Sequence, residues 1–307
     1  MSKFDKIEEL QNLIKEDSSN FQARRQLAVL LMDCGFNEEA LGHLLYLSKN
    51  FTDDEGIFYN LGIVYEKMKK YEKAKEAYIQ ALEIEPESLD SIYNLGLVYT
   101  ELKEYQYAIE CFNRILEDDS EDSNTYFNLG LVYFKQNKYI PAMENFQKTI
   151  DINDDDLYAH FYIGNIFKEL GDLDSAREKF NKVLELSPDY SWAYYNLAVI
   201  DYEEADVSSA VYNLQKTIEL NPLDSEAYKI LAKVLLANGD NSQACDVIQE
   251  ALSRCEASGD LYYLAGWIFK SAEDFEAARN YFNEAIKNFK TLSVPISVVK
   301  IELSNLQ

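Results

Sequence analysis

Four asparagines recur in this chain at a regular spacing, and their side chains could form hydrogen bonds with a ligand. Asn60, Asn94 and Asn128 are 34 residues apart, and Asn196 falls two such intervals further on. A carboxamide offers a hydrogen-bond donor and an acceptor together, which matches the backbone of an extended peptide whatever its side chains. The residue before each asparagine is aromatic: Tyr59, Tyr93, Phe127 and Tyr195. The series therefore predicts a binding surface.

Residues that commonly carry out catalysis are scarce. Histidine occurs only at His43 and His160, which leaves little material for a zinc site or a Ser-His-Asp arrangement. The four cysteines are dispersed without a Cys-x-x-Cys pair, and we interpret them as reduced structural thiols. Close carboxylate pairs are expected by chance among 54 acidic residues. We expect no enzymatic activity, no metal site and no cofactor.

The spacing of the asparagines belongs to a repeat that runs through most of the chain. Alanine recurs every 34 residues without an insertion or deletion, at Ala40, Ala74, Ala108, Ala142, Ala176, Ala210, Ala244 and Ala278. A fixed period of this length indicates stacked copies of one supersecondary unit. The copies start at residues 21, 55, 89, 123, 157, 191, 225 and 259, and positions are counted from these residues.

Each copy carries two apolar stripes with helical spacing, at positions 4, 7, 8 and 11 and at positions 20, 24 and 27. A polar hinge near position 15 separates them, and it is glycine at Gly35, Gly171 and Gly239. We therefore predict an all-α fold of antiparallel helix pairs. Position 8 is glycine in five copies, which we attribute to a close approach of the two helices.

The two ends of the chain read as caps on one continuous solenoid. Residues 1–20 contain an apolar helical face formed by Ile7, Leu10, Leu13 and Ile14, and residues 293–307 form a second helical segment with Pro295 near its start. The repeats occupy residues 21–292. In the sixth copy Asp201 falls at position 11, which should be buried, so either its helix is rotated or the acid is paired.

The repeat resembles that of the tetratricopeptide repeat family. The segments FYNLGIVY (58–65), IYNLGLVY (92–99) and YFNLGLVY (126–133) match the family's aromatic residue at position 4, Leu-Gly at 7 and 8, and Tyr at 11. Alanine at 20, an aromatic residue at 24 and proline at 32 complete the signature. The resemblance covers residues 21 to 292. It implies a right-handed α-solenoid of eight copies with capping helices.

In this family, positions 2, 5, 9 and 12 of the first helix line a concave groove that binds peptides, and position 6 lies beside them. The resemblance thus implies a groove centred on copies two to five and lined by Tyr59, Asn60, Ile63, Tyr93, Asn94, Leu97, Phe127, Asn128, Leu131, Phe134, Phe161, Trp192, Tyr195, Asn196 and Tyr202. The alternative is that the aromatic residues at position 5 pack between repeats and that the asparagines are structural. Some relatives hold a C-terminal carboxylate with a clamp of cations. Here position 2 has no basic residue and the other clamp positions offer only Arg25, Lys229 and Lys233, so we do not expect such a clamp.

The net charge of the chain limits the classes of partner that it can bind. With 29 basic and 54 acidic residues the formal net charge is −25, which repels phosphate backbones, so we expect no binding of nucleic acid. The N-terminus shows no apolar signal segment, and the apolar run at 261–269 is too short to span a bilayer, so we expect a cytoplasmic protein without membrane insertion. The acidic segments 117–122 and 151–156 are interpreted as helix caps that aid solubility, with docking of a basic partner as the alternative.

These features predict a non-enzymatic scaffold or adaptor that binds a basic or apolar segment of a partner protein in the concave groove. The alternative is a structural assembly protein that self-associates, or organises a multi-protein complex, through its convex or end surfaces.

Overall fold

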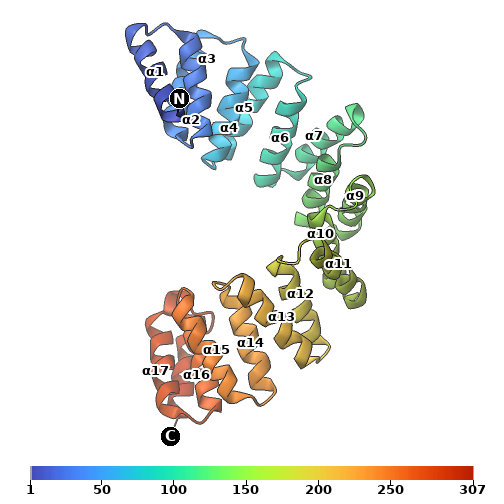
Figure 1. Ribbon diagram of the computed structural model, residues 1–307, viewed down its shortest axis with the longest axis vertical. Helices are drawn as coiled ribbons and strands as arrows, with labels where there is room; N and C mark the ends of the chain where they lie inside the picture. Colours follow the sequence, from blue (N-terminus) through green and yellow to red (C-terminus); the bar gives the residue numbers. More distant parts are fainter. Residues whose placement is uncertain (1, 307) are drawn as a thin grey trace. The chain divides into compact units, whose positions relative to one another are not determined.

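The computed structural model describes residues 2–306, and every regular element in that range is a helix. The prediction of an all-α fold of helix pairs, an α-solenoid, is confirmed. The chain divides into two compact units, Met1–Asp154 and Asp155–Gln307 (Figure 1). Each unit is described by itself below.

The first unit contains a single helix followed by four helix pairs. Its helices are α1 (Lys3–Glu16), α2 (Phe21–Asp33), α3 (Asn37–Asn50), α4 (Glu55–Lys67), α5 (Tyr71–Ile84), α6 (Leu89–Glu101), α7 (Tyr105–Asp118), α8 (Ser123–Lys135) and α9 (Tyr139–Ile152). Helix α1 packs on α2 through the buried side chains of Ile7 and Leu10.

The second unit contains four further helix pairs and a terminal helix. Its elements are α10 (Leu157–Glu169), α11 (Leu173–Leu186), α12 (Ser191–Glu203), α13 (Val207–Leu220), α14 (Ser225–Ala237), α15 (Asn241–Arg254), α16 (Gly259–Ser271), α17 (Phe275–Lys287), the 3-10 turn η1 (Phe289–Thr291) and α18 (Ile296–Ser304). Helix α18 packs on α17 and buries Val299.

In most of the helix pairs, a short polar side chain caps the N-terminus of the first helix. The side chains of Asp54, Ser88, Asp122 and Asp156 accept hydrogen bonds from backbone N–H groups in the first turns of α4, α6, α8 and α10. Such caps satisfy donors that have no partner inside the helix. The acidic segments around 122 and 156 therefore do contribute helix caps, as the sequence predicts.

The hinge between the two helices of a pair has the same backbone conformation in all eight copies. Position 15 has a positive φ in every case, from 57° at Lys69 to 88° at Gly239. Glycine adopts this left-handed conformation without strain, whereas an L residue with a side chain loses roughly 1–2 kcal/mol. Three copies use glycine, and the other five place Lys69, Lys103, Asn137, Ala205 and Glu273 there.

The glycines at position 8 make room for an aromatic ring. A Cβ atom built on Gly96 would lie 2.9 Å from the ring of Phe112, and one built on Gly130 would lie 2.6 Å from that of Phe146. All five copies with glycine at position 8 carry an aromatic residue at position 24, while the three with alanine carry Leu44, Leu214 and Ile248. The position-24 ring therefore accounts for these glycines more specifically than a general approach of two helices does.

The acid at position 11 of the sixth copy is paired. Asp201 is fully buried, and its two oxygens accept hydrogen bonds of 2.6 Å each from Arg177 Nη1 and Asn213 Nδ2. The same guanidinium also contacts Glu204 through Nη2 at 2.5 Å. Of the two explanations left open by the sequence, pairing is the one observed.

Candidate functional site: a peptide-binding surface on the first helices

In the first unit, the asparagines and tyrosines of the first helices bond to one another across successive copies. Asn94 Nδ2 donates to Tyr59 Oη at 3.2 Å, and Asn128 Nδ2 donates to Tyr93 Oη at 2.7 Å. Each bond joins position 6 of one copy to position 5 of the copy before it. The amide N–H groups thus hold neighbouring copies together, while the amide oxygens remain as acceptors.

The aromatic residues at position 5 also contribute to the core. The ring centroid of Tyr93 lies 5.9 Å from that of Phe112, and Phe127 lies 5.5 Å from Phe146. These rings are half-buried, and burial raises the pKa of the Tyr93 hydroxyl. One edge of each ring therefore packs within its own copy, and the rest stays accessible.

A pocket with a volume of about 410 Å³ opens on the same helices of the first unit. Three of the predicted residues line it: Leu97, Asn128 and Leu131. The other lining residues, which were not predicted, are Glu66, Lys67, Lys69, Tyr71, Thr100, Glu101 and Lys135. Its volume falls in the range of ordinary ligand sites. We call this pocket, with the predicted residues of α4, α6 and α8 around it, the first-helix surface.

The charged rim of this pocket is mostly paired within the protein. Lys135 Nζ lies 2.8 Å from Glu101 Oε1, and Tyr78 Oη donates to Glu66 Oε2 at 3.2 Å. Burial raises the pKa of Glu66. Glu66 and Thr100 stand at position 12, which the family resemblance places in the groove. The sequence predicts site residues at this position only where they are aromatic.

The remaining predicted residues of the first unit are not among those that line this pocket. Asn60 Nδ2 donates to the Gly56 carbonyl of its own helix at 2.6 Å, and Ile63 is half-buried. The half-buried ring of Phe134 lies 6.0 Å from that of Tyr139.

Five predicted residues belong to the second unit, so the structure does not establish one surface through all fifteen. Trp192 and Tyr202 are exposed by 52% and 48%, and the Trp192 ring lies 5.9 Å from Tyr195. Phe161 is half-buried, and its ring lies 5.8 Å from that of Phe180. Asn196 differs from the other asparagines because it is buried; it donates to the Trp192 carbonyl at 2.8 Å and accepts from Lys168 Nζ.

A smaller pocket of about 260 Å³ lies between α14, α16 and the segment before α18. Lys229 and Lys233 line it together with Tyr263 and Trp267. Lys229 is paired with Glu226 of its own helix.

Groups suited to other chemistry are few in the part of the chain that the structure describes. Within residues 2–306 there is no cluster of histidine, cysteine and carboxylate side chains that could hold a metal ion, and no helix is long and apolar enough to cross a membrane. Burial raises the pKa of Cys111 to about 11 and also raises the pKa of Cys245 and Cys255. These three side chains are therefore thiols, not reactive thiolates, at neutral pH.

Helix pairs of 34 residues with a left-handed hinge and a Gly–aromatic contact define the class of helical-repeat proteins. Sequence models of the tetratricopeptide repeat match residues 57–88, 87–155, 213–246 and 259–289, and a further model of this repeat matches residues 164–204. The chain belongs to the tetratricopeptide repeat family. No curated protein sequence matches the chain.

Several solved structures share the fold. A tetratricopeptide repeat protein from Parabacteroides merdae is 18% identical with a TM-score of 0.58, covering 82% of this chain and 98% of that one. The C-terminal part of a repeat protein from Cytophaga hutchinsonii is 18% identical with a TM-score of 0.60, covering 75% and 94%. MamA from Desulfovibrio magneticus RS-1 is 24% identical with a TM-score of 0.53, covering 56% and 97%. The family and its architecture support a protein-interaction scaffold.

Proposed function

We propose that this protein is a non-enzymatic adaptor of the cytoplasm that binds an extended segment of a partner protein along the first-helix surface. The pocket lined by Leu97, Asn128 and Leu131 is the observation that carries the proposal. The partner segment places an apolar side chain against the two leucines. The adaptor takes no cofactor and does not bind nucleic acid.

Two features make this surface suitable for a peptide. The half-buried leucines at position 9 are apolar side chains that the core of the helix pairs does not fully cover. The oxygens of Asn94 and Asn128 can accept N–H groups of a peptide backbone, because their own N–H groups are held by Tyr59 and Tyr93. A preorganised amide loses little side-chain freedom when a ligand binds.

The test is to select binders from a random library of twelve-residue peptides and to measure the Kd of the best one for two variants. Leu97→Ser combined with Leu131→Ser should weaken binding at least tenfold, since removing apolar anchors can cost roughly 2 kcal/mol or more. The matched control is Ile140→Ser, which removes an apolar side chain exposed by 67% on α9. That variant should keep the original Kd.

A photoreactive form of the selected peptide gives a readout that does not depend on any variant. It should label α6 and α8 of the unaltered protein. Labelling of the second helices alone, with an unchanged Kd for the leucine variant, would rule the proposal out. Concentration-dependent oligomers in sedimentation, with no peptide selected, would instead support the assembly protein named above as the alternative.

A further inference from the structure

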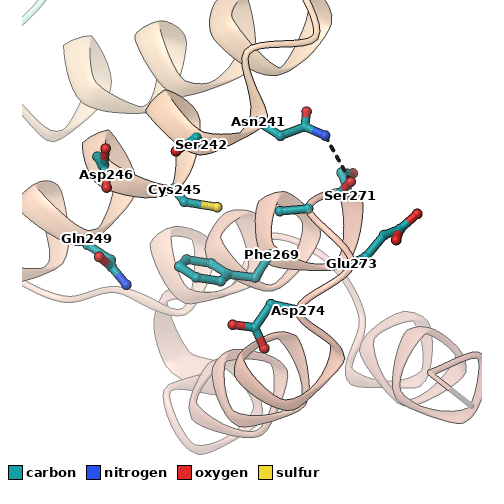
Figure 2. Close-up of a pocket in the computed structure, with 10 residues that line it drawn as sticks. Asn241, Ser242, Cys245, Asp246, Gln249, Phe269, Ser271, Glu273 and Asp274 are labelled. Carbon is teal, nitrogen blue, oxygen red and sulfur yellow. Dashed lines mark hydrogen bonds between the residues drawn. The ribbon is translucent and has the colours of Figure 1, made fainter.

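A pocket of about 540 Å³ lies in the second unit, on the side of the second helices. Asn241, Ser242, Cys245, Asp246 and Gln249 of α15 form one wall. Phe269 and residues 271–274, at the end of α16 and in the turn that follows, form the other. Figure 2 shows the Cys245 thiol, from one wall, above the Phe269 ring, from the other. The first-helix surface does not include any of these residues.

Cys245 lines this pocket with a short side chain, at a position where most copies have a longer one. Cys245 stands at position 21 of the seventh copy. The same position in the other copies holds Leu41, Lys75, Ile109, Met143, Arg177, Val211 and Arg279.

The three cations at position 21 all reach acceptors in or just after the next α-helix. Lys75 Nζ lies 2.9 Å from Glu104 in the next turn, and Arg177 contacts Asp201 and Glu204 at 2.6 and 2.5 Å. Arg279 Nη2 donates to the Leu306 carbonyl at 2.7 Å. The groove after position 21 is thus a place where this fold repeatedly holds a positive charge against oxygen atoms.

In the seventh copy the residue at position 21 carries no charge. Asp274 keeps a carboxylate at the place of Glu104, whereas Phe269 and Ala272 stand where the fifth copy's cation meets acids. The ten lining residues, all in the described part of the chain, include the carboxylates of Asp246, Glu273 and Asp274 but no lysine or arginine. Burial raises the pKa of the Cys245 thiol most, and the negative charges of Asp246 and Asp274 raise it further. Both carboxylates therefore lie close to this side chain. Phe269 adds an aromatic ring, with which a cation interacts favourably.

We propose that this pocket binds the arginine or lysine side chain of a basic segment in a partner protein. The side chain would occupy the place that Lys75 and Arg177 fill in their own copies. Its charge would meet the carboxylates, and its methylene groups would lie against Phe269 and Cys245. This gives the protein a second binding surface, independent of the first-helix surface.

The probe is the peptide acetyl-Gly-Gly-Arg-Gly-Gly-amide, compared with the same peptide carrying citrulline, which has nearly the same shape but no charge. Titration of ¹⁵N-labelled protein should shift backbone signals around Cys245, Gln249 and Glu273. The half-saturating concentration should be at least fivefold lower for the arginine peptide. Asp246→Asn combined with Glu273→Gln should remove this preference.

The control variant is Glu117→Gln combined with Asp118→Asn, which removes the same charge from an exposed part of α7. It should bind the arginine peptide as the unaltered protein does, and so should the Leu97→Ser, Leu131→Ser variant. Equal responses to arginine and citrulline, or equal weakening by the control, would show only the general attraction of an acidic surface and would overturn the proposal.

A tethered cation provides a second test. Cys245→Arg should raise the melting temperature above that of Cys245→Met, which has a comparable length without charge, and it should abolish the response to the arginine peptide. If Cys245→Arg is no more stable than Cys245→Met, the pocket is not complementary to a cation.

Discussion

At the scale of single residues, Asp201 shows how the chain accommodates a departure from its own repeat. A buried carboxylate is costly unless charged and hydrogen-bonding partners compensate for the lost water. Arg177 comes from the copy before it and Asn213 from the second helix of its own copy. The three side chains therefore tie two successive copies together through polar contacts where other copies use apolar ones.

We expect Arg177→Met to destabilise the protein by about 3 kcal/mol, because it leaves the buried carboxylate without its charge partner. The same change in an Asp201→Asn background should cost much less, since no buried charge remains there. Urea unfolding, with and without Arg177→Met in each of the two backgrounds, measures the two changes in the free energy of unfolding. Lys216→Met, which removes only a surface pair with Glu219, should leave the free energy of unfolding nearly unchanged. Equal costs for Arg177→Met in the two backgrounds would show that Arg177 does not act through Asp201.

At the scale of the helix pair, positions 8 and 24 behave as one unit of packing. Glycine occurs where a ring needs the space of a Cβ atom, and alanine occurs where the partner is aliphatic. Protein interiors are packed closely enough for a single methyl group to matter. Packing of the aromatic ring in the core offsets the free-energy cost of placing glycine inside a helix.

Gly96→Ala should therefore cost about 1–3 kcal/mol through overpacking against Phe112. Adding Phe112→Leu should recover part of that loss, so that the double variant is more stable than the sum of the single changes predicts. Gly42 is a suitable control because it lies inside α3 with open space around its Cα. Gly42→Ala should stabilise by about 1 kcal/mol. Thermal or urea unfolding measures all four variants, and strict additivity would contradict the proposed coupling.

At the scale of the whole molecule, each unit is an array of helices in which the main contacts join helices that are neighbours in sequence. Such an array needs no long-range charge pattern to fold, so its surface is free to carry a net charge of −25. That charge favours solubility and attracts basic segments at a distance.

The same charge leads us to expect no complex with nucleic acid. A protein that neutralises few phosphates releases few counterions and so gains little free energy from binding. In a gel-shift measurement at physiological salt, neither DNA nor RNA should move with this protein. A tight complex that weakens with added salt would contradict this expectation.

Much of the architecture could be predicted from the sequence because it depends on local properties. Helical spacing of apolar residues, glycine at a hinge and short polar residues before a helix act within one copy, and eight copies repeat the same information. The helices of residues 21–287, the hinge at position 15 and the caps at Asp122 and Asp156 follow from such patterns, whereas the left-handed conformation of the hinge is seen only in the structure.

The candidate sites could be predicted only in part, because contacts between copies decide them. The position-6 pattern alone does not show that Asn128 bonds to Tyr93 while Asn196 is buried and bonds to Trp192 and Lys168. Nor does it show that Cys245 lines a pocket while Arg177 pairs with Asp201, since this depends on how far a side chain reaches into the next copy. The sequence by itself determined the repeating helix pair; the tertiary structure decided which side chains meet across copies, because that depends on side-chain length and on the packing of one pair against the next.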